Sequence, residues 1–355
     1  MRVTRRDQHG GLESESGDER RRIRSREQRR QLDRTRTRIK TGSAPSQGAL
    51  AGIVITPVGP RWVVGIGPDL YVCSVSGVLD APHSSSPVAV GDDVWVLPEA
   101  TSSEADFTGT IVKVEERRTV LSRKMAGRAR REQVLASNVE SMLIVMAAAQ
   151  PDYNKRLIDR YLIAADKGDL EVTIVINKMD LLPQEYHQDV WEDLQVYHDQ
   201  LGIPVVLTSV SKGQGIEALA ELLHNRSTLL AGPSGVGKSS IINLFSDVQQ
   251  RVGEISRKFD KGRHTTTAAT LLPLREGGSV VDTPGIREFA IWELGSDELP
   301  FYFEEFAPFA EQCKFMPCSH THEPGCAVKA AVEEGAIDEE RYVSYLNLRA
   351  ETSDE

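Results

Sequence analysis

The segment Gly232-Pro-Ser-Gly-Val-Gly-Lys-Ser-Ser240 fits the pattern GxxxxGK(S/T) and lies between a short apolar run and a run with helical spacing. Its glycines let the backbone curl so that successive N–H groups converge on phosphate oxygens at a helix N-terminus. Lys238 would reach the β- and γ-phosphates, and the Ser239 hydroxyl would bind Mg²⁺. The residues predicted to bind the nucleotide here are Gly232, Pro233, Ser234, Gly235, Val236, Gly237, Lys238, Ser239 and Ser240. This strand–loop–helix setting favours a nucleoside triphosphate site over a chance glycine turn.

Around this loop, residues 134–295 alternate apolar strands with amphipathic helices, which is typical of a mostly parallel sheet covered on both faces. The predicted strands are 141–146, 172–176, 205–208, 227–231, 268–273 and 279–281. The predicted helices lie near 155–167, 188–201, 216–223 and 238–245. The sequence therefore predicts an α/β nucleotide-binding domain.

A second motif, Asn177-Lys178-Met179-Asp180, follows a predicted strand, where a ligand-binding loop belongs. The Asp180 carboxylate can accept hydrogen bonds from guanine N1–H and N2–H₂ together, a donor pair that adenine lacks. Asn177 can bond the guanine edge or brace neighbouring loops, and the stem of Lys178 can lie along the base. Ser209, after the next predicted strand, can present a backbone N–H to guanine O6. Together these residues predict selectivity for guanine nucleotides.

Two further segments are predicted to sense the γ-phosphate. Asp282-Thr-Pro-Gly285 ends the strand predicted at 279–281, so that Asp282 would hold a water on Mg²⁺ and the Gly285 N–H would bond the γ-phosphate. The polar segment 261–267 can order when a threonine hydroxyl reaches Mg²⁺. Thr266 is the favoured ligand, and the threonines on either side of it stay open. Guanine selectivity, a Mg²⁺-bound triphosphate and two γ-phosphate sensors predict a GTPase.

The order of these motifs is unusual. Most GTPases run from phosphate loop to threonine switch, DxxG, NKxD and a final base loop. Here the base-binding segments at 177 and 208 precede the phosphate loop at 232, the threonines at 265 and DxxG at 282. Neighbours in a sheet need not be neighbours in sequence, so the sheet can survive this change. The sequence thus predicts a circularly permuted P-loop GTPase domain, with the join near 224–227.

Residues 1–48 are dense in Arg, Glu, Ser and Asp and poor in apolar side chains. Within them, residues 1–40 hold 14 Lys and Arg against 7 Asp and Glu, although the whole chain has a net charge of −10. Such a segment buries too little surface to offset its ordering entropy, so it is predicted to be a disordered arm. Its arginines either neutralise RNA phosphates or only solubilise the chain. The interspersed acids argue against a transit peptide.

Five short strand-like runs follow within residues 49–115, at 52–55, 62–66, 70–75, 93–97 and 110–114. They predict a small Greek-key barrel, for which an OB-fold is the leading candidate. Such barrels often bind RNA through stacked aromatics. Aromatic residues at strand spacing are nevertheless more often core, and this holds for Trp62, Tyr71, Trp95 and Phe107. Cys73 is expected in the same core. Residues 116–133 are predicted to be a basic linker, either solvated or facing phosphates.

Three of the four cysteines lie within fourteen residues near the C-terminus, which favours a metal site over a disulfide scaffold. Cys313, Cys318, His320 and Cys326 supply three thiolates and an imidazole, a set that suits a closed tetrahedral Zn²⁺ site. His322 is the alternative imidazole. A closed shell of four protein ligands makes the zinc structural, and residues 327–348 are predicted to be largely helical. Residues 296–355 are therefore predicted to form a small helical zinc-binding domain.

With 355 residues, the chain is long enough for two or three domains. Its longest apolar run, 142–149, is far shorter than the roughly 20 residues that a membrane helix needs. The arginine-rich N-terminus is not typical of a signal peptide. The chain is therefore expected to be cytoplasmic and monomeric, with no membrane partner.

The permuted order, the segments GRHTTT and DTPG, the Cys/His cluster and the preceding barrel together resemble the RsgA (YjeQ) family of small-ribosomal-subunit-dependent GTPases. The resemblance covers roughly residues 50–345. It implies an OB-fold that binds ribosomal RNA, a permuted GTPase domain and a zinc domain. It also implies a role in late maturation of the small ribosomal subunit, which would stimulate GTP hydrolysis to GDP and phosphate and so trigger release. Two departures are the arginine-rich arm and the non-basic segment 73–80, which shift the expected RNA contacts toward the arm and linker.

Ile286 follows DTPG where many GTPases carry a glutamine that orients the attacking water. Isoleucine cannot hydrogen-bond that water, so slow intrinsic turnover is expected. His264, in the threonine segment, either supplies the missing polar contact on the ribosome, as proposed for the family, or only shapes its loop. Lys238 and Gly285 complete the predicted catalytic set. The alternative function is a GTP-regulated RNA-binding placeholder with negligible hydrolysis.

Overall fold

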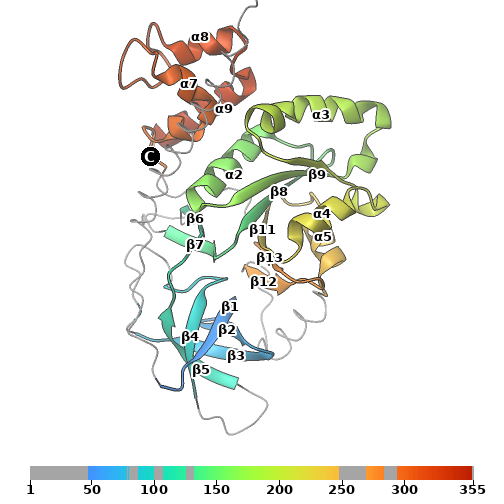
Figure 1. Cartoon of the computed structure of the whole chain (residues 1–355), viewed down its shortest axis with the longest axis vertical. Helices are drawn as coiled ribbons and strands as arrows, with labels where there is room; N and C mark the ends of the chain where they lie inside the picture. Colours follow the sequence, from blue (N-terminus) through green and yellow to red (C-terminus); the bar gives the residue numbers. More distant parts are fainter. Residues whose placement is uncertain are drawn as a thin grey trace, which may run out of the picture. The chain divides into compact units, whose positions relative to one another are not determined.

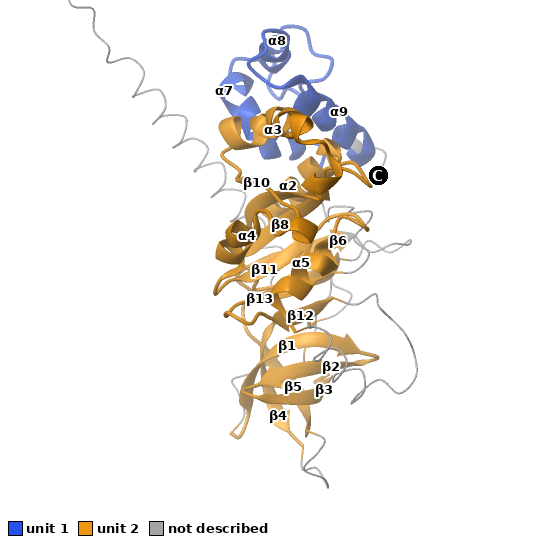
Figure 2. Ribbon diagram, turned by 90° about the vertical axis from the view of Figure 1, so that its right-hand side faces the viewer, with its two compact units in different colours: residues 1–37, 294–355 blue, residues 38–293 orange. Residues whose placement is uncertain are grey.

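The computed structural model describes residues 47–77, 79, 87–99, 107–124, 132–247, 269–283 and 294–353 (Figure 1). The arginine-rich arm up to residue 46 lies outside these residues, as does the segment that contains His264. Two compact units divide the chain (Figure 2). One spans Arg38–Glu293 and the other includes Leu294–Glu355, and each is described by itself.

Five strands of the larger unit close into a barrel: β1 (Leu50–Val58), β2 (Arg61–Ile66), β3 (Asp69–Val75), β4 (Asp93–Pro98) and β5 (Phe107–Val114). Their order is β1-β2-β3-β5-β4, with β1 and β4 paired to close it. Strands β3 and β5 run parallel, and the other pairs are antiparallel. Fully buried side chains fill the interior, among them Val54, Cys73 and Ile111. The predicted OB-fold barrel and the core position of Cys73 are confirmed.

The barrel aromatics divide between core and surface contacts. The Tyr71 and Phe107 rings stack at 5.0 Å, and Tyr71 is buried. Trp95 donates from Nε1 to Glu115 at 2.6 Å. Trp62 packs against both the barrel core and the core of the neighbouring sheet. Each of the four rings thus has a structural partner, but only Tyr71 is buried as the sequence pattern favours, and the other three are half-buried.

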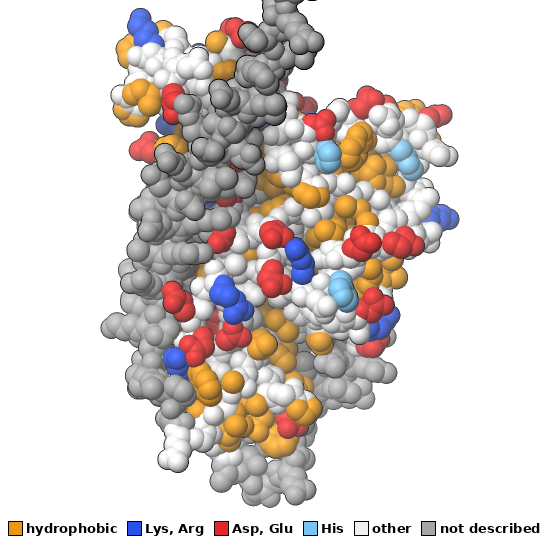
Figure 3. All heavy atoms as spheres, viewed as in Figure 1, with side chains coloured by type: hydrophobic (Ala, Val, Ile, Leu, Met, Phe, Trp, Pro, Cys, Tyr) orange, Lys and Arg blue, Asp and Glu red, His pale blue; other side chains and the backbone are white. Residues whose placement is uncertain are grey.

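The surface of the described residues mixes charges of both signs. On the face seen in Figure 3, Lys and Arg side chains are interspersed with Asp and Glu. No helix among the described residues is both long and apolar enough to span a bilayer.

A β-hairpin follows the barrel, where the basic linker was predicted. Strands β6 (Val120–Lys124) and β7 (Glu132–Ser137) form a two-stranded antiparallel sheet. Leu121 and Ala136 on these strands are fully buried in the core of the neighbouring sheet. A Cβ on Gly168, the last residue of helix α2 (Lys155–Gly168), would lie 2.5 Å from the Val120 carbonyl oxygen, so the hairpin packs closely there. Charged residues dominate this segment, so its sequence pattern does not predict the two strands.

A buried ion pair ties the end of the barrel to this hairpin. Arg117 donates from Nε to Asp92 Oδ1 at 2.7 Å, and the two side chains are 5% and 0% exposed. Ser137 donates from Oγ to the same Asp92 oxygen at 2.6 Å, and the Ala89 N–H donates to its other oxygen at 2.7 Å. Because all these groups are partnered, the charge of Asp92 is compensated in the interior.

Six strands form the central sheet, in the order β10-β9-β8-β11-β13-β12. They are β8 (Ser141–Ala147), β9 (Glu171–Asn177), β10 (Val205–Leu207), β11 (Ser227–Ala231), β12 (Thr270–Pro273) and β13 (Ser279–Asp282). Only β12, at one edge, runs antiparallel to its neighbour. The predicted strands are confirmed within one or two residues, except that 268 lies outside the described residues.

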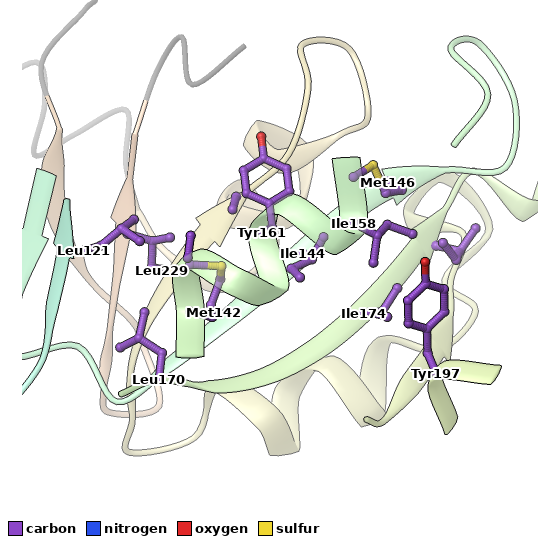
Figure 4. Close-up of a cluster of buried hydrophobic side chains, with 14 of the residues drawn as sticks. Leu121, Met142, Ile144, Met146, Ile158, Tyr161, Leu170, Ile174, Tyr197 and Leu229 are labelled. Carbon is purple, nitrogen blue, oxygen red and sulfur yellow. The ribbon is translucent and has the colours of Figure 1, made fainter. Parts of the chain in front are cut away.

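Helices cover both faces of this sheet: α2 (Lys155–Gly168), α3 (His187–Gln195), α4 (Ile216–Leu223) and α5 (Lys238–Phe245). Side chains alternate along β8, so that Met142, Ile144 and Met146 join the core under α2 and α3 (Figure 4). Leu143 and Val145 join the core under α4 and α5. The long apolar run at 142–149 is therefore explained by a central strand that is buried on both faces. Beyond α3, the predicted helix continues as a π-helical turn (Val196–Gln200).

In the smaller unit, helices α7 (Ala307–Ala310), α8 (Ala327–Glu333) and α9 (Glu339–Ser353) surround an aromatic core. Phe303, Phe306 and Tyr345 are fully buried and contact one another at 5.0–5.4 Å between ring centroids. The helical prediction for 327–348 is confirmed, with a break at Gly335, whose φ is +76°. Short 3₁₀-helical turns complete the described elements. Those of the larger unit are Met179–Leu181, Gln184–Tyr186 and Val210–Lys212, and those of the smaller unit are Leu299–Tyr302 and Glu304–Phe306.

Candidate nucleotide and zinc sites

The topology of the central sheet places two candidate ligand loops side by side. After β8, the chain adds β9 and β10 on one side and later β11 and β13 on the other. In a parallel sheet, such a reversal of strand order opens a crevice at the carboxyl ends of the strands. The loop after β9 carries Asn177 and Asp180, and the loop after β11 carries Gly232 to Lys238. Both loops therefore leave the same edge of the sheet.

The phosphate-binding loop owes its shape to three glycines. Gly232, Gly235 and Gly237 have φ of +144°, +85° and +103°, a region that side chains with a Cβ rarely adopt. A Cβ on Gly232 would fall 2.0 Å from the Val145 carbonyl oxygen of β8. Lys238, the first residue of α5, donates from Nζ to the carbonyls of Gly232 and Pro233, both at 2.8 Å. The Lys238 side chain thus lies across the phosphate-binding loop and bonds its backbone.

Asn177 joins the two loops. It is 2% exposed, and its Nδ2 donates to the Val236 carbonyl in the phosphate loop at 2.9 Å. Its Oδ1 accepts from the Val210 N–H and the Thr208 hydroxyl, both at 3.3 Å. One side chain therefore fixes the phosphate loop and the loop after β10 to the end of β9. Residues that lie 59 and 33 positions apart in the chain are held together in this way.

Asp180 is exposed, and its carboxylate is braced by two hydroxyls. Ser209 donates to Oδ1 at 2.5 Å and Ser211 donates to Oδ2 at 2.8 Å. These two bonds lower the pKa of Asp180, so the ionised form that would accept from guanine is favoured. The backbone N–H of Ser209, predicted to face guanine O6, instead donates to the Gln214 carbonyl at 3.0 Å, and it is the Ser209 hydroxyl that contacts the site. The sequence gives no sign of Ser211, which lies in the short helical turn Val210–Lys212.

Two other residues near the loops were missed. Tyr161 on α2 is fully buried and makes a hydrogen bond with the backbone of Gly232, while burial raises its pKa to about 12. The Gln150 carbonyl, in the loop after β8, accepts from Lys178 Nζ. Both belong to segments without a motif, and an ordinary helix pattern gives no sign that a tyrosine hydroxyl reaches a ligand loop.

Asp282 ends β13 beside the phosphate loop. It lies opposite Leu230 of β11 in the sheet register, one strand from the loop that follows β11. Burial raises the pKa of Asp282, and the charge of Lys238 acts in the opposite direction. The carboxylate and the ammonium group are thus close enough to interact. Thr266, His264 and Gly285 lie outside the described residues.

In the smaller unit, Cys313, Cys318, His320 and Cys326 gather with their ligand atoms all within 4.8 Å of one another. The Cys313 sulfur lies 3.6 Å from His320 Nδ1 and 3.9 Å from the Cys326 sulfur, and Nδ1 lies 3.4 Å from the latter. A tetrahedral Zn²⁺ with ordinary bond lengths requires about 3.8 Å between sulfurs and about 3.5 Å between sulfur and nitrogen. The cluster fits one structural zinc, and His322 is not part of it.

The shell around this cluster orients its ligands. Tyr342 and Tyr345 of α9 donate to the carbonyls of His320 and Ser319 at 2.7 and 2.5 Å. Phe306 lies edge-on to the His320 ring at 5.9 Å. The helices of this small unit therefore pack against the metal-binding loop itself, which makes the metal part of the core.

Taken together, the fold and the loops define a GTPase of the P-loop class whose sequence order is circularly permuted. A model of the RsgA GTPase family matches residues 114–292. Small ribosomal subunit biogenesis GTPase RsgA of Chlorobaculum parvum is 44% identical over 306 residues, which cover 84% of this chain and 97% of that protein. The protein of the same name from Gemmatimonas aurantiaca is 39% identical over 303 residues, which cover 84% of this chain and 96% of that protein.

Solved structures agree. YjeQ from Thermotoga maritima matches with a TM-score of 0.64 and 33% identity, over 86% of this chain and 99% of that one. YloQ, described as a circularly permuted GTPase, matches with a TM-score of 0.61 and 28% identity, over 86% and 96%. The chain belongs to the RsgA GTPase family, as its motifs predict.

Replacing Gly237 with alanine is expected to lower GTP affinity roughly 10- to 100-fold. The new Cβ would fall 2.2 Å from Asn177 Nδ2, at a backbone φ of +103°. Titration with a fluorescent GTP derivative measures the loss. Gly59→Ala is the matched control, because it also carries positive φ but meets nothing within 4 Å. Equal affinities for the two variants would contradict the role of Asn177 as the link between the loops.

Proposed function

We propose that this protein is a GTP hydrolase that binds the small ribosomal subunit, assists its late maturation in the cytoplasm and leaves after hydrolysis. One observation carries the proposal: the loops after β9 and β11 are fastened together by Asn177, whose Nδ2 donates to the Val236 carbonyl at 2.9 Å. That bond holds at one edge of the sheet the two loops that carry Asp180, proposed to bind guanine, and Lys238, proposed to bind the phosphates. Its relatives' name supplies the subunit as partner.

Each predicted residue has a proposed role. Asp180 selects guanine, and Lys178 lies along the base. The phosphate loop from Gly232 to Ser240 holds the triphosphate, with Lys238 on its β- and γ-oxygens. The proposed Mg²⁺ ligands are Ser239, Thr266 and, through water, Asp282. When bound, Mg²⁺ neutralises charge that develops on the phosphates.

The boundaries proposed for the parts are 1–48 for the arm, 49–115 for the barrel, 116–133 for the basic linker, 134–295 for the GTPase domain and 296–355 for the zinc domain. We further propose that a single chain contacts ribosomal RNA. We propose the arm and the linker as the main phosphate contacts because both segments are rich in arginine. Affinity for the subunit should then fall steeply with salt.

His264→Ala is expected to lower subunit-stimulated GTP turnover about 10²-fold, because no side chain at 286 can orient the attacking water. Phosphate release is measured with and without purified small subunits. His224→Ala, an exposed histidine outside the proposed site, is the control. Unchanged stimulation in His264→Ala would refute its role with Gly285 in hydrolysis. Tight subunit binding by the wild type with no turnover above background would instead favour the placeholder alternative.

A further inference from the structure

The hydroxyl of Thr56 in the barrel touches the GTPase sheet. Thr56 on β1 is only 7% exposed, and its Oγ1 donates to the Ala269 carbonyl at 3.2 Å. The same oxygen lies 3.0 Å from Thr270 Oγ1. The contacted residues are 213 and 214 positions further along the chain. This is a polar contact between a barrel strand and the edge of the central sheet.

A β-bulge aims Thr56 at that edge. Along β1, Val54 pairs with Val64 while Thr56 pairs with Val63, so Ile55 is an extra residue in the strand. The bulge shifts the alternation by one position. Val54 therefore points into the barrel core, whereas Thr56, two residues later, leaves that face and reaches β12. A regular strand would have turned this hydroxyl inward.

The contacted position is adjacent to both proposed γ-phosphate sensors. Ala269 and Thr270 come directly after the span that holds the threonines at 265–267. Thr270 is also the register partner of Asp282, the first residue of DTPG. Thr56 therefore contacts the start of β12, the strand that follows the threonine segment. The same point of β12 pairs with the end of β13, the strand that leads into the DTPG segment.

The barrel has a second anchor on the hairpin. There the buried pair Asp92–Arg117 and the Ser137 hydroxyl hold the barrel end, with distances of 2.6–2.7 Å. With the barrel end fixed at Asp92, a displacement of the barrel would act on the central sheet through the Thr56 contact.

We propose that Thr56 is a positioning residue that couples the barrel to the two γ-phosphate-sensing segments, so that a partner held by the barrel changes the rate of GTP hydrolysis. The inference deepens the proposed function and rests on it for the identity of those segments. Thr56 does not touch the nucleotide. The same contact is expected to act in the other direction, so that β1 responds to whether GTP or GDP is bound; this is a separate expectation, because linkage constrains binding free energies and not rates.

Turnover tests the forward direction. Thr56→Val keeps the shape of the side chain but removes the hydroxyl, and it is expected to lower the ratio of subunit-stimulated to basal turnover about three- to tenfold, the effect of one lost hydrogen bond. Thr56→Ser, which keeps the hydroxyl, should restore the ratio. Thr110→Val is the matched control, since it removes a half-buried hydroxyl from the Ser74–Thr110 pair between strands β3 and β5, also at 3.0 Å. An unchanged ratio in Thr56→Val would overturn the proposal.

Hydrogen exchange tests the reverse direction and needs no ribosome. In the full chain, amide exchange of the β1 peptide is compared with GDP and with a non-hydrolysable GTP analogue bound. Wild type and Thr56→Ser should show a nucleotide-dependent difference that is lost in Thr56→Val. A difference that persists in Thr56→Val, or none in the wild type, would overturn the coupling. If exchange of the β1 peptide depends on the nucleotide but small subunits do not raise the rate of GTP hydrolysis, the coupling stands and the proposed function is refuted.

Discussion

Asp180→Asn is expected to weaken GTP binding by roughly 10²- to 10⁴-fold, because a carboxylate that accepts two guanine N–H bonds is replaced by an amide that cannot accept both. The amide can instead donate to the O2 of xanthine, so xanthosine triphosphate should become the preferred nucleotide. Competition titrations with the two nucleotides measure the exchange of preference. Ser209 and Ser211 lower the pKa of Asp180, so GTP affinity should be independent of pH near neutrality.

Asp189→Asn is the control for charge, because Asp189 is exposed on α3 and has no role in the proposed site. Its GTP affinity should equal that of the wild type. Retained preference for GTP in Asp180→Asn would remove the base-binding assignment, and with it the reason to connect Asp180 to the phosphate loop.

Removal of zinc is expected to unfold the smaller unit of the chain. Structural Zn²⁺ contributes about 10–16 kcal/mol to the folding of small domains, more than a unit of this size gains from its core. Either a strong chelator or His320→Ala should abolish the single equivalent of zinc per chain. Limited proteolysis should then cut within Leu294–Glu355 while the larger unit stays resistant.

His322→Ala is the matched control. His322 is exposed and bonds through Nδ1 to the Thr321 hydroxyl at 2.9 Å, outside the four-ligand cluster. It should keep one zinc per chain and resist proteolysis. A metal-free preparation with an intact smaller unit would contradict a structural role for zinc.

Local chemistry explains what the sequence could predict. Glycine spacing around Lys238 and the run of apolar residues before it allow few structures other than a phosphate loop between strand and helix. Cys313 and Cys326 are close in sequence, so the cluster follows from spacing and ligand type. Even the permutation was visible, because it concerns only the order of motifs. Each motif by itself lies within about twenty residues.

Contacts across long sequence separations could not be predicted in this way. The hydroxyl of Thr56 meets Ala269 only because a bulge turns the strand, and a bulge has no reliable signal in one sequence. Tyr161 reads as an ordinary apolar-face residue, yet it bonds the backbone of Gly232. The sequence predicts a linker where β6 and the start of β7 lie, since the charged residues there outnumber the few that are buried.

The central claim is that segments shuffled along the chain build one GTP site. A crystal structure of the full chain with Mg²⁺ and a non-hydrolysable GTP analogue tests it most directly. The account predicts guanine on the Asp180 carboxylate and the γ-phosphate on Lys238, with one nucleotide spanning both loops. A nucleotide held by Lys238 whose base lies away from Asp180 would contradict it.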